Sequence, residues 1–387
     1  MFKPFKWVMG FVLCISATSS FATTTVEIAY LGQPSQQESV SSNIEPTPAD
    51  LGEAGAQLAI QDNDSTGKFV QQNFKLARHQ ITPQTSVDAV YALLAKNSAR
   101  FVVLNVPASR LEQLVRHPDW SRYVWLNAGS RDDVFRQSRC QPNLLHTLPG
   151  RAMQADALAQ YLVSKRWTKW ALVRGQHIED QRYAAAIVRA AKRFGAVIQA
   201  QKVWNGGHDA RRTAQAEVPL LTQMGDYDVL IVADEKNDFG DYFLFRTWLP
   251  RPVAGTQGLV ADGWHAAAEQ WGATQLQNRF KAFAKRPMLA VDYAAWAAVR
   301  TIGEAATRTQ SNQFDTLVHY IRSPEFELAA FKGRSLSYRT WNGELRQPVF
   351  LAQPRALVST SPQEGFLHPH TDLDTLGFDQ SEVRCHA

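Results

Sequence analysis

The chain has 387 residues and carries 41 Lys and Arg against 36 Asp and Glu, a net charge of +5. This balance excludes a nucleic-acid-binding protein that depends on a strongly basic surface. The length predicts roughly two to three domains.

The N-terminus has the pattern of a secretory signal peptide. Lys3 and Lys6 form a basic start, residues 7–15 are mostly apolar, and small residues around Phe21 lead to a cleavage site after Ala22. The apolar run is shorter than the roughly 20 residues that span a bilayer. We therefore expect residues 1–22 to be removed and the mature chain to be exported, with no membrane span left in it.

From residue 26 onward, β-rich runs alternate with amphipathic helical patterns, which is typical of parallel sheets built from βαβ units. Several runs are almost entirely apolar, as strands buried on both faces must be. The predicted strands cover residues 26–31, 101–106, 123–126, 170–173, 197–203, 229–233 and 258–261. The predicted helices cover residues 54–61, 86–95, 152–164, 180–193, 274–284 and 291–307.

A polar stretch with Pro and Gly at residues 139–150 interrupts this alternation, which then restarts. We therefore predict a first lobe over residues 23–140 and a second lobe over residues 141–255. A further pause at residues 250–258 predicts that part of 256–330 returns to the first lobe.

The character of the sequence changes again towards the C-terminus. Two β-rich runs on either side of Asn342 and Gly343 predict a hairpin with a tight turn over residues 335–352. This hairpin lies in a segment, residues 331–358, that we assign to the hinge region. The tail, residues 359–387, is polar, and we expect it to be irregular.

Two cysteines remain in the mature chain, Cys140 in its middle and Cys385 near its end. An oxidising compartment favours a disulfide between them, which would fix the tail to the rest of the protein. The alternative is a pair of separate thiols.

Motifs follow one another in a fixed order along the mature chain, at residues 54–64, 142–147, 154, 157–162, 264–265, 290–296, 331–333 and 345–348. In order and spacing this set resembles type I solute-binding proteins, the group that contains the branched-chain amino-acid receptors. The hairpin, together with the ending at residues 368–374, is similar to one branch, the binding proteins associated with PQQ-dependent alcohol dehydrogenase systems.

The resemblance implies an α/β fold of two lobes, with the ligand held in the cleft between them. It implies a periplasmic substrate-binding component of an ABC transporter, which works with a permease and an ATPase and requires no cofactor. The expected ligand is an alcohol-derived acid, an amino-acid-like molecule or a metal linked to PQQ-dependent alcohol oxidation. Because the common hydrolase, zinc-protease, phosphate-loop and redox-cysteine motifs are missing, we expect no enzymatic activity.

Polar residues that follow the predicted strands are candidates for the cleft, because ligands of open α/β sheets bind beyond the carboxyl ends of the strands. In amino-acid receptors of this fold the corresponding turns supply hydroxyl and N–H groups to the ligand carboxylate, and Ser109 and Ser130 match that chemistry. Asn127 and Asp132 follow the same strand as Ser130. The alternative is that the two serines are ordinary turn and helix-cap residues.

The second lobe offers acids after its strands. Glu179 and Asp180 follow one strand, and Asp234 and Glu235 follow another, where they suit an ammonium group or a hard cation. Acids at such points also cap helix N-termini, which is the alternative role. Trp264 follows the strand predicted at residues 258–261 and is expected to face the cleft.

The tail carries a second candidate for metal binding. His368, His370, Asp372 and Asp374 lie close together in the sequence and could bind zinc or copper. Such a site would favour a different function, a metal-binding accessory or chaperone protein that docks with a periplasmic dehydrogenase. The alternative is that these side chains form hydrogen bonds with the adjacent lobe.

Overall fold

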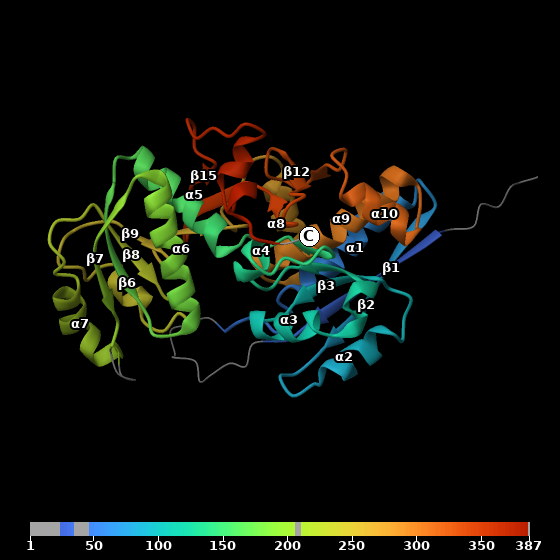
Figure 1. The fold of residues 1–387 in the computed structure, drawn as a ribbon, viewed down its shortest axis with the longest axis horizontal. Helices are drawn as coiled ribbons and strands as arrows, with labels where there is room; N and C mark the ends of the chain where they lie inside the picture. Colours follow the sequence, from blue (N-terminus) through green and yellow to red (C-terminus); the bar gives the residue numbers. More distant parts are fainter. Residues whose placement is uncertain (1–23, 35–45, 206–209, 386–387) are drawn as a thin grey trace, which may run out of the picture.

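The computed structural model of the chain describes residues 24–34, 46–205 and 210–385. Two α/β lobes lie side by side along the longest axis of the molecule (Figure 1). The predicted signal peptide, residues 1–22, lies outside the described residues. No helix among the described residues is long and apolar enough to span a membrane.

The first lobe is built on a parallel five-stranded sheet of order β2-β1-β3-β4-β5. Its central strands β3 and β4 are apolar because both faces of the sheet are covered. The strands are β1 (Thr24–Gly32), β2 (Gln72–Gln80), β3 (Phe101–Asn105), β4 (Val124–Asn127) and β5 (Leu144–His146).

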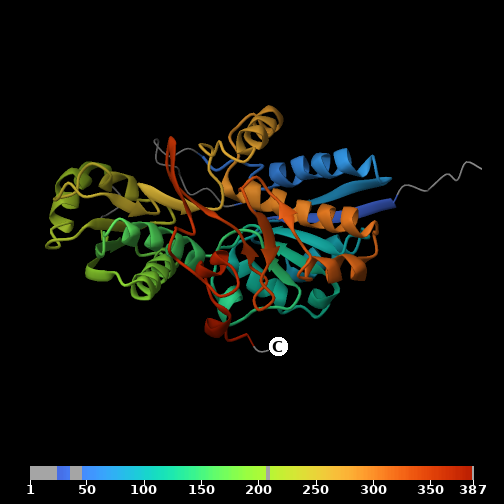
Figure 2. The same cartoon turned by 90° about the horizontal axis from the view of Figure 1, so that it is seen from above.

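Helices cover both faces of this first sheet (Figure 2). The long helix α9 packs along α1 on one face of the sheet. The chain therefore returns to the first lobe after it has formed most of the second. These helices are α1 (Glu53–Gly67), α2 (Val87–Leu94), α3 (Ala108–Val115), α4 (Val134–Gln137), α8 (Ala273–Ala284), α9 (Ala290–Thr309) and α10 (Phe314–Ile321), with a short 3-10 turn η1 (Pro118–Arg122).

The second lobe is built on a seven-stranded sheet of order β15-β14-β10-β9-β8-β6-β7. Its parallel part is β6 (Lys169–Arg174), β7 (Val197–Val203), β8 (Val229–Ala233), β9 (Val253–Gly255) and β10 (Leu259–Asp262). Two antiparallel strands, β14 (Val349–Gln353) and β15 (Ala356–Ser361), complete it. Its helical elements are α5 (Arg151–Ser164), α6 (Ile178–Phe194), α7 (Ala210–Leu221) and η2 (Gly240–Phe243).

The predicted hairpin is present in a shorter form than expected. Strand β12 (Ser335–Tyr338) pairs with β13 (Leu345–Arg346), and β11 (Leu328–Ala329) extends this small sheet. The second arm of the hairpin divides after β13, because β14 leaves it to pair with β10 of the second lobe. The hairpin segment is therefore also one of the connections between the lobes.

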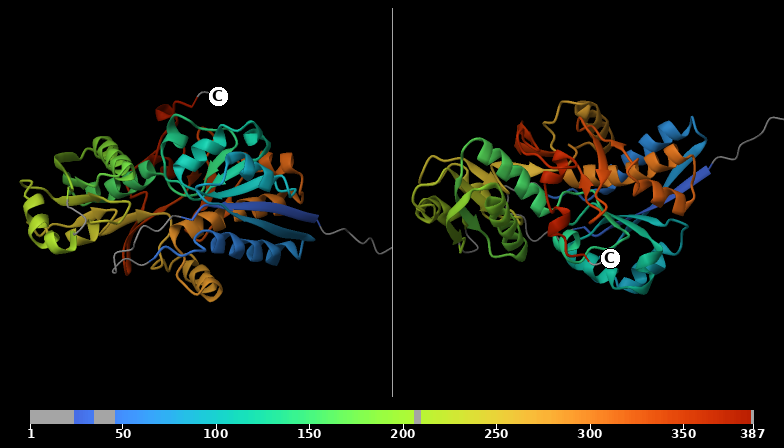
Figure 3. Two further views of the ribbon diagram at one scale, coloured as in Figure 1. Left: turned by 90° about the horizontal axis from the view of Figure 1, so that it is seen from below. Right: turned by 45° about the horizontal axis from the view of Figure 1, so that its top comes forward.

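The tail is more regular than expected. Strand β15 includes the first residues of the predicted irregular segment, because the exposed edge of β14 offers it backbone partners. The remainder contains the 3-10 turns η3 (Asp372–Thr375) and η4 (Gln380–Glu382). The predicted disulfide is present: Cys140 and Cys385 are bonded across a separation of 245 residues, with their Cα atoms 5.3 Å apart. The tail thus returns to the first lobe (Figure 3).

Candidate functional site

Two cavities open between the lobes. The first, which we call the arginine chamber, has a volume of about 670 Å³ and lies between the starts of α3 and α4 in the first lobe and α6 in the second. The second, the tryptophan chamber, has a volume of about 610 Å³. The arginine chamber is defined by Ser109, Asp132, Asp133, Arg151, Glu179 and Arg182, and the tryptophan chamber by Arg131, Gln257, Asp262, Trp264, Leu289 and Phe350.

Two ion pairs join the lobes at these chambers. Arg131 Nη2 of the first lobe lies 2.8 and 2.9 Å from the carboxylate oxygens of Asp262, the last residue of β10. Asp132, the next residue, pairs with Arg182 on α6. Two neighbouring residues of the turn after β4 are therefore bonded to two elements of the second lobe, β10 and α6. Any movement of the lobes apart would therefore break both pairs.

The predicted site residues fall into two groups. Ser109, Asp132 and Glu179 line the arginine chamber, and Trp264 lines the tryptophan chamber. Asn127, Ser130, Asp180, Asp234 and Glu235 line neither chamber in the part of the chain that the structure describes. The structure thus brings predicted residues from both lobes to one cleft, although five of the predicted residues do not line either chamber.

Asn127 and Ser130 shape the turn that presents the first-lobe charges. The Asn127 side-chain oxygen accepts a hydrogen bond from the Ser130 N–H at 2.9 Å, and its Nδ2 donates to the Ser130 carbonyl at 2.8 Å. The Ser130 hydroxyl in turn accepts from the Asp132 N–H at 3.3 Å. These side chains fix the loop after β4 in the way that Asn and Ser fix turns generally.

Asp180 and Asp234 bind backbone N–H groups, as expected of helix and turn caps. Asp180 accepts from Glu235 N at 2.7 Å and from His177 N at 3.2 Å, and burial raises its pKa to about 6. Asp234 accepts from the N–H groups of three successive residues, the last at 2.6 Å from Gly240. These two carboxylates hold the start of α6 and the loop after β8 in place behind the cleft.

The arginines of the cleft were not identified from the sequence. Arg131, Arg151 and Arg182 each form an ion pair with a carboxylate, whereas the residues predicted for the cleft are acids, two serines, one asparagine and one tryptophan. One signal was present: Arg131 lies in the same turn as Ser130 and Asp132. Arg151, the first residue of α5, and Arg182, in the second turn of α6, carry no local signal of this kind.

Asp133 lies at the wall of the arginine chamber, and no arginine side chain among the described residues is bonded to its carboxylate. Both of its oxygens accept from the Ala152 N–H, at 3.1 and 3.0 Å, and burial raises its pKa to about 7. Because the unfolded carboxyl titrates near 3.8, its contribution to stability is complete below that pH and is lost as the pH rises towards 7.

We therefore expect Asp133→Asn, which cannot ionise, to reduce the pH dependence of stability. Between pH 5 and pH 8 the free energy of unfolding of the wild type should fall by about 1–2 kcal/mol more than that of the variant. This value is smaller than the pKa shift alone would give, because the Asp133 side chain is partly exposed and solvent screens its charge. Urea unfolding at both pH values measures it. If the free energies of unfolding of the two proteins change equally between these pH values, the raised pKa of Asp133 is wrong.

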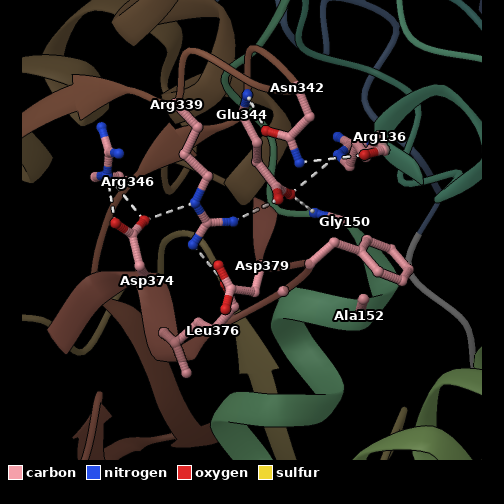
Figure 4. Close-up of polar contacts among 12 residues, drawn as sticks. Arg136, Gly150, Ala152, Arg339, Asn342, Glu344, Arg346, Asp374, Leu376 and Asp379 are labelled. Atoms are coloured by element: carbon pink, nitrogen blue, oxygen red, sulfur yellow. Dashed lines mark hydrogen bonds and ion pairs between the residues drawn. The ribbon is translucent and has the colours of Figure 1, made fainter. Parts of the chain in front are cut away.

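The hinge region contains a buried network centred on Glu344 (Figure 4). One Glu344 oxygen accepts from Arg136 Nε of the first lobe at 3.0 Å and from the Gly150 N–H at 3.1 Å. The other accepts from Arg339 Nη1 at 3.0 Å, and Arg339 Nε donates to Asp374 of the tail at 2.9 Å. One carboxylate therefore joins the first lobe, a segment that crosses to the second lobe, the hairpin and, through Arg339, the tail.

Three of the four tail residues proposed as metal ligands have other side-chain partners, whereas the side chain of His370 is exposed. Asp372 contacts Arg334 at 2.6 Å, and Asp374 lies in the network of Figure 4. His368 Nε2 lies 3.5 Å from Asp379. Within the described ranges, no group of three or more His, Cys, Asp or Glu residues is arranged to hold a metal ion. The tail contacts correspond to the alternative in which these side chains fasten the tail to the lobes.

Neither a protein-family model nor a curated protein matches the sequence. Solved structures do match. A periplasmic binding protein from Burkholderia mallei superposes with a TM-score of 0.65 and 15% identity, covering 93% of this chain and 98% of that one. A branched-chain amino acid ABC transporter periplasmic ligand-binding protein from Burkholderia xenovorans superposes with a TM-score of 0.69 and 16% identity. The match covers 93% of this chain and 99% of that one.

The branched-chain amino acid transporter substrate-binding protein of Streptococcus pneumoniae, solved in complex with isoleucine, gives a TM-score of 0.64 and 13% identity, covering 87% of this chain and 99% of that one. These matches extend over nearly the full length of each neighbour, and at such identities they establish the fold. The chain therefore has the two-lobed α/β fold of periplasmic binding proteins, similar to that of the substrate-binding proteins of ABC transporters.

Proposed function

We propose that this protein captures a small solute in the cleft between its lobes and presents it to an ABC permease and its ATPase in the periplasm. The observation that carries the proposal is the pair of chambers between the lobes, bounded by the ion pairs Arg131–Asp262 and Asp132–Arg182. A solute that contacts both lobes favours the closed arrangement, because only that arrangement brings all of its partners together.

The same geometry favours binding over chemistry. The cleft side chains form ion pairs with one another or bind backbone groups, and the fold neighbours named above are binding proteins. We further propose that the solute is linked to PQQ-dependent alcohol oxidation. That part rests on the sequence of the hairpin and of residues 368–374, and a PQQ-dependent dehydrogenase would then be a functional neighbour of the transporter.

Native mass spectrometry with elemental analysis tests the proposal on protein purified gently from the periplasm. We expect one small organic molecule per chain, because closed lobes exclude solvent from their ligand. The same sample, unfolded and refolded, serves as the empty control. A stoichiometric metal with no organic mass would instead support a metal carrier, and a protein that neither retains nor binds any small solute would overturn the proposal.

A further inference from the structure

Most of the end of the tail is packed onto the second lobe. Leu376 is fully buried in the core of that lobe, and the N–H of Gly377 donates to Asp156 Oδ2 of α5 at 2.9 Å. Arg189 of α6 donates to the Gly377 carbonyl at 2.9 Å and pairs with Glu382 at 2.9 Å. Residues 376–382 are therefore expected to move together with the second lobe.

The next residues are bound to the first lobe instead. The N–H of Arg384 donates to the carbonyl of Gln137, the last residue of α4, at 2.6 Å, and Cys385 is bonded to Cys140. Gln137 also lines the arginine chamber. In Figure 2 this end of the tail lies at the edge of the molecule, away from the strands that join the lobes. The tail thus passes from one lobe to the other beside the arginine chamber.

The link between the two attachments is short. Two residues, 383 and 384, separate Glu382 from Cys385. A fully extended chain spans at most about 3.3–3.6 Å per residue, so these three steps reach about 10 Å. The disulfide cannot lengthen, whereas an ion pair can separate and form again. The tail therefore sets an upper limit on the distance between α6 and the end of α4 as long as Glu382 stays with Arg189.

We propose that residues 376–385 form a covalent strap that restricts the opening of the lobes at the arginine chamber. The strap removes the most open conformations and so favours the closed arrangement, in which the chamber is enclosed by both lobes. This inference goes beyond the proposed function, because it concerns the movement of the lobes and holds for any solute. It also gives the disulfide a role in the working protein in addition to its role in stability.

Pulsed electron paramagnetic resonance between two spin labels tests the strap. The labels replace Gln113 of α3 and Val188 of α6, which are both exposed, and an encoded keto amino acid carries them so that the cysteines stay free of label. The protein is unfolded and refolded without reductant, which removes solute and keeps the disulfide. About 0.5 M sodium chloride weakens the ion pairs between the lobes. In the Cys140→Ser, Cys385→Ser variant the mean distance should exceed that of the wild type by at least about 5 Å, half the reach of the short link.

A second variant keeps the disulfide and lengthens the strap. An insertion of about six Gly and Ser residues between Val383 and Arg384 adds about 20 Å of reach, so this variant should open as far as the double serine variant. The same insertion after Gly365 is the matched control. Gly365 is exposed, precedes the residues fixed to the second lobe and has open space around it, so this insertion leaves the short link unchanged. The control should keep the wild-type distances.

Three results would overturn the strap. One is an equal distance distribution in the wild type, the double serine variant and the variant lengthened after Val383. Another is opening in the double serine variant alone, which would show that the bond acts through packing and not through its reach. The third is opening in the control lengthened after Gly365. These distances are measured without solute, so the native mass spectrum decides independently whether the protein carries one.

Discussion

Glu344→Gln is expected to destabilise the protein by about 3–5 kcal/mol, the cost of leaving buried charges without a partner. Arg136 and Arg339 lie on either side of Glu344, and each of the three side chains is at most 1% exposed. The variant keeps the shape of the side chain and removes only its charge, so the loss reports the electrostatics of the hinge. The midpoint of urea unfolding and its slope measure the effect.

Glu112→Gln is the matched control for this variant. Glu112 also pairs with two arginines, Arg116 at 2.6 Å and Arg139 at 2.6 Å, but it lies at the surface with 39% of its side chain exposed. Exposed ion pairs contribute little because solvent screens them. If Glu344→Gln costs no more than Glu112→Gln, the buried network does not stabilise the hinge and the prediction is wrong.

Removing the disulfide is expected to have the second largest effect. In the Cys140→Ser, Cys385→Ser double variant we expect a loss of about 2–4 kcal/mol, because the bond closes a loop over a separation of 245 residues in the unfolded chain. Unfolding curves of the wild type with and without reductant should differ by a similar amount. Reductant should not affect the double variant, which provides the control.

The position of the tail gives this bond a second consequence. Arg189 of α6 donates to the Gly377 carbonyl at 2.9 Å and contacts Glu382 at 2.9 Å, so the tail is fastened to the second lobe. Its end is fastened to the first lobe by Cys385. The tail therefore connects the two lobes, by noncovalent contacts with the second and by the disulfide with the first. Equal stability of the double variant and the wild type would show that the noncovalent contacts suffice.

Some features of this protein could be predicted because their signals are local. Strands β3, β6 and β8 are apolar runs buried on both faces, and α6 has a charged cap and a regular apolar stripe. The disulfide was predicted from the two cysteines of the expected mature chain and from the predicted export signal. Strand β2 was missed because it forms the edge of its sheet, where polar side chains reach solvent and the pattern weakens. Helix α3 was not predicted either.

The site depended on pairings that no local pattern contains. The sequence places Ser109, Asp132 and Glu179 after strands, and parallel strands bring such residues to one edge, so their meeting at the arginine chamber could be anticipated. Whether an acid faces a ligand, caps a helix or binds an arginine is decided by the opposite lobe. Arg131 and Asp262 are 131 residues apart, and Arg136 and Glu344 are 208 apart. The sequence by itself determined the apolar strands and the longer amphipathic helices, whereas charge pairing across the cleft and hinge was decided only by the tertiary structure, because electrostatic energy depends on distance in space.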